Sequence, residues 1–142
     1  MVFLLIPIYL QSACMKATGE TTYEEITRIK SPDNKYEAVL VSATTDVIGN
    51  NSHYLYIVPT GRKFDVKDVN FSRRYLNIRC FEGLQLIWQD PKILEVQYKE
   101  ALIEEFRNCV NLTEDPESPF IVELRLTPLT TFALPGNCPC LK

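Results

Sequence analysis

The residues of this 142-residue sequence whose type and spacing could do chemistry are its five cysteines. Cys14 ends an apolar run, and the other four are Cys80, Cys109, Cys138 and Cys140. An even number of cysteines in an exported chain is typical of disulfides, and these four allow a few alternative pairings. We expect a disulfide to join the C-terminal tail to the body, from Cys109 or Cys80 to Cys138 or Cys140.

The same four thiols could instead bind zinc, which thiolates hold in tetrahedral geometry. However, Cys138-Pro139-Cys140 is a C-x-C spacing, whereas zinc knuckles usually place about two to four residues between their cysteines. A redox site would need C-x-x-C near a βαβ pattern, and the sequence has neither. We therefore expect no metal and no cofactor.

Catalytic groups of other kinds are scarce. His53 is the one histidine, and the sequence has no G-x-S-x-G, P-loop or G-x-G-x-x-G motif. The acidic pairs Glu104-Glu105 and Asp115 with Glu117 could serve in acid–base chemistry or bind a hard cation, but such charges are more often solvated. We expect no catalytic residue and a binding role rather than an enzymatic one.

The charge balance excludes one class of partner. Lysine and arginine number 15 against 18 acidic residues, for a net charge of −3, and basic residues adjoin only in pairs, at Arg62-Lys63 and Arg73-Arg74. Nucleic-acid binding needs a basic stripe that neutralises phosphates. We therefore expect no nucleic-acid partner.

The first residues have the pattern of an export segment. Val2–Leu10 is almost wholly apolar, but about 20 such residues are needed to cross a bilayer. A secretory signal peptide has an apolar segment of about 7–15 residues followed by small residues, which Ser12 and Ala13 supply. The positive charge that usually precedes this segment is missing, because the first basic residue is Lys16.

Leu10-Gln11-Ser12-Ala13-Cys14 resembles the lipobox of bacterial lipoproteins, although Gln11 stands where that family usually has leucine. The resemblance implies that Cys14 carries a lipid and that the protein is anchored in the membrane on the extracytoplasmic side of the cell envelope. It divides the chain into a signal segment (1–14), a polar tether (15–30) and a single β domain with a cysteine-containing tail (31–142). The residues also allow Val2–Leu10 to be a first strand and Cys14 a small hydrophobe.

The rest of the chain has the pattern of β-strands. Ser31–Tyr36 predicts a turn into a strand over Glu37–Val41, and Val47–Asn51 predicts a connection to a strand over His53–Val58. Lys99–Phe106 has a composition that favours helix, but its neighbours are strands and we expect a strand there too. Apolar and polar residues alternate, as in half-buried antiparallel strands, over 76–80, 84–88, 94–98 and 120–126.

Ser31–Tyr36 looks like the SPDGKY-type turn of β-propeller blades, but a chain of this length holds too few blades to close a propeller. Together with Tyr56-Ile57-Val58-Pro59 and the pair Ile87–Asp90 and Leu94–Tyr98, the turn resembles small uncharacterised bacterial lipoproteins. That resemblance implies a location and a fold, and no activity. We expect a mainly β domain: a single small antiparallel sheet, sandwich or meander of about six to seven strands, not a closed propeller.

Two functional interpretations remain. The first is a lipid-anchored extracytoplasmic module that binds the membrane through its lipid and an unknown protein or envelope component through exposed aromatics such as Tyr54, Tyr56 or Tyr98. Those rings could instead fill the core. The alternative is a small soluble cytosolic protein-interaction or inhibitor/immunity-type domain without lipidation. We predict the first.

Overall fold

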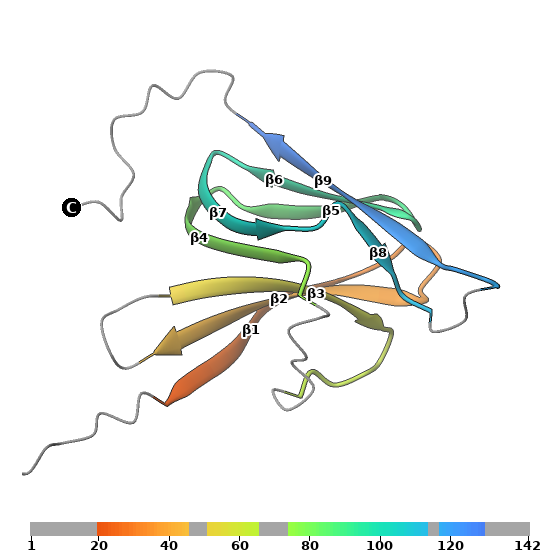
Figure 1. Cartoon of the computed structure of the whole chain (residues 1–142), viewed down its shortest axis with the longest axis horizontal. Helices are drawn as coiled ribbons and strands as arrows, with labels where there is room; N and C mark the ends of the chain where they lie inside the picture. Colours follow the sequence, from red (N-terminus) through yellow and green to blue (C-terminus); the bar gives the residue numbers. More distant parts are fainter. Residues whose placement is uncertain (1–19, 46–50, 66–73, 114–116, 130–142) are drawn as a thin grey trace, which may run out of the picture.

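The computed structural model describes residues 20–45, 51–65, 74–113 and 117–129, which form nine strands in two sheets (Figure 1). The five-stranded sheet has the order β1-β2-β3-β4-β7 and the four-stranded sheet the order β5-β6-β9-β8. Within these ranges no helix is long and apolar enough to cross a membrane. The strands are β1 (Thr21–Lys30), β2 (Tyr36–Thr45), β3 (Asn51–Pro59), β4 (Leu76–Glu82), β5 (Gln85–Asp90), β6 (Ile93–Tyr98), β7 (Glu100–Phe106), β8 (Cys109–Asn111) and β9 (Ile121–Pro128).

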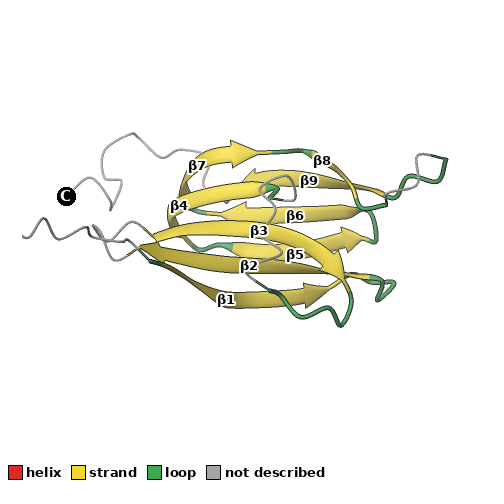
Figure 2. Cartoon of the chain, turned by 60° about the horizontal axis from the view of Figure 1, so that its bottom comes forward, coloured by secondary structure: helices red, strands yellow, loops and turns green. Residues whose placement is uncertain are grey.

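The two sheets face each other and enclose one core (Figure 2). Its buried side chains come from both layers: Ala38, Leu55, Ile57, Leu76 and Ile78 from the five-stranded sheet, and Leu94, Val96, Val122 and Leu124 from the four-stranded sheet. The prediction of a mainly β domain that is not a closed propeller is confirmed. The expected strand number was too small, because short strands such as β8 carry too few residues to show a pattern.

The expectation of a purely antiparallel sheet is wrong at one place. β9 lies between β6 and β8; it runs antiparallel to β8 but parallel to β6, with Leu94 opposite Leu124. Between β6 and β9 the chain forms β7 in the other sheet and returns as β8, so the two strands are not joined by a hairpin. Alternating polarity places residues on a face but does not encode the direction of a neighbouring strand.

The tether predicted for residues 15–30 is corrected over its second half, because Thr21–Lys30 forms β1. This segment contains Thr, Tyr and Ile, which favour strands, and it pairs with β2 from Thr21 opposite Thr45 to Lys30 opposite Glu37. Its charged residues face solvent or form ion pairs, and that polarity gave the segment the composition of a linker. Residues 15–19 lie outside the described ranges.

The turn predicted at Ser31–Tyr36 is confirmed. Asp33 Oδ1 accepts hydrogen bonds from Ser31 Oγ at 2.7 Å and from the Lys35 amide at 3.2 Å, and the Tyr36 amide donates to Ser31 Oγ. Asn34 takes the left-handed conformation, with φ of 57°, which asparagine tolerates better than most residues. The turn thereby joins β1 and β2 as a hairpin.

The strands predicted from alternation are also confirmed, as β4, β5, β6 and β9. Lys99–Phe106 is a strand, β7, which pairs with β4 at one edge of the five-stranded sheet. The hairpin of β2 and β3 is present as well, with Tyr36 opposite Pro59. Of its predicted connection Val47–Asn51, residues 47–50 lie outside the described ranges and Asn51 is the first residue of β3. For Lys99–Phe106, pairing with β4 therefore outweighs a composition that favours helix.

The two sides of the sandwich differ. On one side the edge strands β1 and β5 approach each other, and Trp88 Nε1 donates a hydrogen bond to the Ile29 carbonyl at 3.3 Å. On the other side β3 of one sheet and β8 of the other flank a groove. The sandwich is therefore bridged along one side and open along the other.

Candidate functional site

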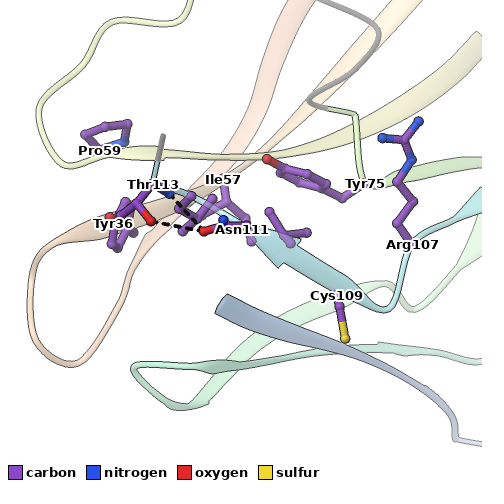
Figure 3. A pocket seen from close by; sticks show the side chains of 10 residues that line it. Tyr36, Ile57, Pro59, Tyr75, Arg107, Cys109, Asn111 and Thr113 are labelled. Atoms are coloured by element: carbon purple, nitrogen blue, oxygen red, sulfur yellow. Dashed lines mark hydrogen bonds between the residues drawn. The ribbon is translucent and has the colours of Figure 1, made fainter. Parts of the chain in front are cut away.

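The groove has a volume of about 230 Å³ and lies between the two sheets on the open side (Figure 3). One wall comes from the five-stranded sheet and the segment before β4, and includes Tyr36, Ile57, Pro59 and Tyr75. The other wall is continuous in sequence and runs from β8 and its flanks: Arg107, Cys109, Val110, Asn111, Leu112 and Thr113.

The groove can bind through several kinds of group. Tyr36 and Tyr75 supply phenol rings, Asn111 an amide, and Arg107 a guanidinium whose side chain is 47% exposed although its Nη2 lies 3.4 Å from Glu105 Oε1. The described lining residues include no carboxylate and no histidine. The groups that are present can hold a ligand by hydrogen bonds, ring contacts and charge.

The end of the groove is shaped by the connection from β8 to β9. Asn111 Oδ1 accepts hydrogen bonds from the Thr113 amide and hydroxyl at 3.2 and 3.1 Å (Figure 3). The Ser118 carbonyl lies 3.0 Å from the same Thr113 hydroxyl and shares its one hydrogen with Asn111 Oδ1, and the hydroxyl accepts from the Phe120 amide. Phe120 in turn packs against Tyr36, with ring centroids 4.8 Å apart. This network fixes the wall that Asn111 and Thr113 present.

The structure separates the two described cysteines. Cys109 is a free, exposed thiol at the rim of the groove, and its sulfur points away from the tyrosine rings (Figure 3). Cys80 lies in β4 at a φ of 49° and is disulfide-bonded, but not to Cys109. Cys14, Cys138 and Cys140 lie outside the described ranges. The lipidation of Cys14 and the pairing with the tail therefore stay predictions.

His53 lies in β3, between Ser42 of β2 and Ile78 of β4, and takes no part in the groove. Its ring meets that of Phe81 edge-on, with centroids 4.7 Å apart, and its buried Nδ1 has no hydrogen-bond partner. Burial lowers the pKa of His53 below its ordinary value of 6.5. The residue is an interstrand histidine and does not form a His–Ser or His–Cys pair.

His53 should make the fold sensitive to mild acid. Because its pKa is lower in the folded protein, the unfolded chain binds the proton more readily, and stability falls as the pH drops below about 6.5. We expect His53→Gln to flatten this dependence between about pH 7 and pH 5. Urea unfolding of both proteins across this range measures it. An unchanged slope in the variant would contradict the assignment to His53.

The acidic pair Glu104-Glu105 does not form a cation site. Glu104 accepts hydrogen bonds from Arg79 Nη1 at 2.8 Å and from Asn77 Nδ2 at 2.9 Å. Glu105 binds Arg74 through Nε and Nη2, and Arg74 also covers the ring of Tyr54. Each carboxylate thus already faces a guanidinium. No group of three or more potential metal ligands occurs in the part of the chain that the structure describes.

The aromatics considered for binding have different roles. Tyr56 is only 4% exposed, and it packs with Val39 and Val41 in a second apolar cluster on the outer face of the five-stranded sheet. Phe64 covers it, with ring centroids 5.3 Å apart. Burial raises the pKa of the Tyr56 hydroxyl, which has no hydrogen-bond partner. Tyr56 therefore fills a core, and Tyr54 and Tyr98 are half-buried.

A shallower hollow next to this cluster is lined by Glu25, Arg28 and Glu37, which bind one another as an ion-pair network. Arg28 Nε and Nη2 each donate to Glu25 at 2.8 Å, and Nη1 donates to Glu37 at 2.5 Å and to the Arg62 carbonyl at 3.1 Å. The hydrogen bonds from Arg28 lower the pKa of Glu25, and the hydrogen bonds to Glu25 and Glu37 raise the pKa of Arg28. The guanidinium has four of its donors committed, so the network holds β1, β2 and residues 61–62 together rather than offering a site.

Of the groove residues, Cys109 is the one that the sequence marks as a candidate site residue. The sequence gives no sign that the others form a set with it: Tyr36, Tyr75, Arg107, Asn111 and Thr113. No local motif joins residues that lie so far apart in the chain, and only the packing of the two sheets brings them together. In comparisons of the chain with known proteins, no family model, no curated protein and no solved structure matches.

Proposed function

We propose that this protein is a lipid-anchored, extracytoplasmic β-sandwich module that binds a partner of the cell envelope in the groove between β3 and β8. The observation that carries the binding role is the groove itself, whose walls bring phenol, amide and guanidinium groups together. The anchor is supported by the resemblance of Leu10–Cys14 to a lipobox. A soluble cytosolic interaction domain without lipidation is the alternative.

The disulfide that we propose joins Cys80 to Cys138 or Cys140. Leu129, the last described residue, donates its amide to the Tyr98 carbonyl at 2.7 Å, and the next residue, Lys99, donates its amide to the Glu82 carbonyl. The tail therefore leaves the body close to the end of β4 that carries Cys80. Eight residues lie between Leu129 and Cys138, and a chain of this length reaches up to about 30 Å from one Cα to the other.

Mass spectrometry of the protein from its native host tests the anchor. We expect a chain that starts at Cys14, is heavier by acyl groups, and contains Cys80 bonded to Cys138 or Cys140 in the non-reduced peptide map. A bond from Cys80 to Cys14 would overturn the anchor, because that sulfur could not also carry a lipid. A full-length chain without acyl groups would favour the cytosolic alternative.

The reactivity of the Cys109 thiol tests whether a partner occupies the groove, because Cys109 lies at its rim. Cleavage after lysine and arginine gives a peptide whose one cysteine is Cys109: residues 108–125 of the natural chain, and residues 100–125 once Arg107→Glu has removed the cleavage site after position 107. We expect a maleimide to label this peptide several-fold more slowly in intact host envelopes than in the purified protein. Arg107→Glu, which reverses the charge in the groove, should restore the rate. Equal rates for the natural chain in both samples would contradict binding in the groove.

A further inference from the structure

We propose that the occupant of the groove is an extended peptide segment of a partner protein, which pairs with β8 as a fifth strand of the four-stranded sheet and sets an acidic side chain against Arg107. This inference rests on the proposed function, since it takes the groove as the binding site. It adds the chemical class of the partner and the way in which the partner is held.

The outer edge of β8 supplies the hydrogen-bonding groups. β8 is an edge strand, and its pairing with β9 extends beyond its three residues, because the Leu124 amide donates to the Asn108 carbonyl and the Leu112 amide to the Phe120 carbonyl. In an antiparallel pair alternate residues bond to the neighbour. Asn108, Val110 and Leu112 thus bond to β9, and the backbone groups of Cys109 and Asn111 point away from it, along the groove.

Of the two strands that border the groove, β3 is less suitable than β8 for pairing with an added peptide strand. It continues to Pro59, although β4 pairs with it only from His53 to Leu55. The Thr60 amide donates to the Lys35 carbonyl, so the alternation turns Ile57 and Pro59 away from β2 and toward the groove. Proline has no amide hydrogen, which leaves Ile57 as the one donor there. β8 offers two such residues.

β8 also differs from the other three edge strands. The register shifts where β1 pairs with β2, where β5 pairs with β6 and where β7 pairs with β4, whereas β8 pairs with β9 without a shift. Bulges on edge strands discourage the addition of another strand. β1 is further engaged by the hydrogen bond from Trp88 to its Ile29 carbonyl. β8 is therefore the regular edge of this sandwich.

The lining of the groove indicates which peptide fits. Arg107 is its one cation, and the described lining residues contain no carboxylate, so charge complementarity favours an acidic side chain on the partner. Tyr36, Ile57 and Tyr75 form a wall that suits an apolar side chain on the same face of an added strand. The volume of about 230 Å³ accommodates a few side chains and is small for a drug-sized ligand.

The test begins with selection of linear peptides from a phage-displayed random library against the purified full-length protein. A selected peptide is then synthesised with single N-methyl groups at successive amides, which removes one donor at a time. If the peptide adds as a strand, alternate N-methyl positions should weaken binding about fivefold or more, and the positions between them should have little effect. We expect an acidic residue in the selected peptides and weaker binding to Arg107→Gln.

A matched pair of protein variants tests whether the backbone of β8 bonds to the peptide. Cys109→Pro removes the amide that points into the groove and leaves the bonds to β9 in place, whereas Cys109→Ser keeps that amide. We expect Cys109→Pro to lose binding at least about fivefold and Cys109→Ser to bind like the natural protein. Far-ultraviolet circular dichroism checks that both variants fold. The N-methyl series uses the natural protein and so does not depend on their folding.

The peptide experiments would overturn the proposal in any of three ways: N-methyl effects without alternation, selected peptides that bind a folded Cys109→Pro as well as the natural protein, or no selected peptide at all. A dimer of the natural protein that Cys109→Pro dissociates would also overturn it, because the occupant would then be a second copy. If peptides fail while Cys109 is protected in envelopes, the proposed function stands and only the peptide is wrong. If peptides bind the purified protein but Cys109 is unprotected in envelopes, the proposed function fails.

Discussion

Arg28→Leu is expected to lower the free energy of unfolding by about 3 kcal/mol, the largest effect that we anticipate from an ion-pair residue. The side chain of Glu37 is only 4% exposed, and its Oε2 lies 2.5 Å from Arg28 Nη1. The Gly61 amide donates to the same oxygen at 3.3 Å, which cannot replace a cation. Removing Arg28 leaves a buried carboxylate without its counter-charge, and this is costly. Urea unfolding measures the loss.

The control for Arg28→Leu is the double variant Arg28→Leu with Glu37→Leu. It removes both charges, and we expect it to recover a large part of the loss because no uncompensated charge remains. Lys99→Leu breaks an exposed ion pair with Glu82 and should change stability by less than about 1 kcal/mol. Similar losses for Arg28→Leu and Lys99→Leu would show that burial of Glu37 does not govern the effect.

Leu94→Ala is expected to destabilise the fold by about 3 kcal/mol as well, for a different reason. Leu94 is 0% exposed, and it lies in the core between the two sheets, in β6 and opposite Leu124 of β9. Truncation removes buried methyl groups and leaves a cavity that two rigid sheets cannot close. Thermal or urea unfolding of the natural protein and the variant gives the difference.

Leu102→Ala is the matched control, because it is the same change in another strand. Leu102 lies in β7 and is 46% exposed, so its truncation should cost less than about 1 kcal/mol. Comparable losses at Leu94 and Leu102 would contradict the placement of the core between the sheets. Neither residue lines the groove, so both variants should keep whatever binding the groove provides.

The outer faces of the two sheets differ in a way that bears on function. The outer face of the four-stranded sheet carries hydrogen-bonded polar groups, such as Arg125 with Glu123 and Gln89 with Glu95. The outer face of the five-stranded sheet carries the second apolar cluster around Tyr56, which is largely buried. The large apolar side chains that are exposed in the described ranges are Ile26, Leu102, Phe106, Ile121 and Leu129. The groove differs from both faces because it combines polar side chains with the backbone of an edge strand.

Local sequence patterns located most strands correctly. The turn at Ser31–Tyr36 needs the hydrogen bonds of Ser31 and Asp33 and the left-handed conformation of Asn34, all of which lie within six residues. Alternation between apolar and polar residues located β4, β5, β6 and β9, because each of these strands has one face in the core. Polarity misled the prediction at β1, where charged residues form ion pairs on a strand.

The sequence by itself therefore determined that the domain is mainly β, where most of its strands lie, and which face of β4, β5, β6 and β9 packs on the core. Only the tertiary structure decided how the strands are ordered, that β6 and β9 are parallel, and that β3 and β8 flank a groove. The physical reason is the separation along the chain of the residues that interact. Side-chain alternation is a property of a few consecutive residues, whereas strand pairing and the meeting of Tyr36 with Thr113 depend on contacts between segments far apart in the chain.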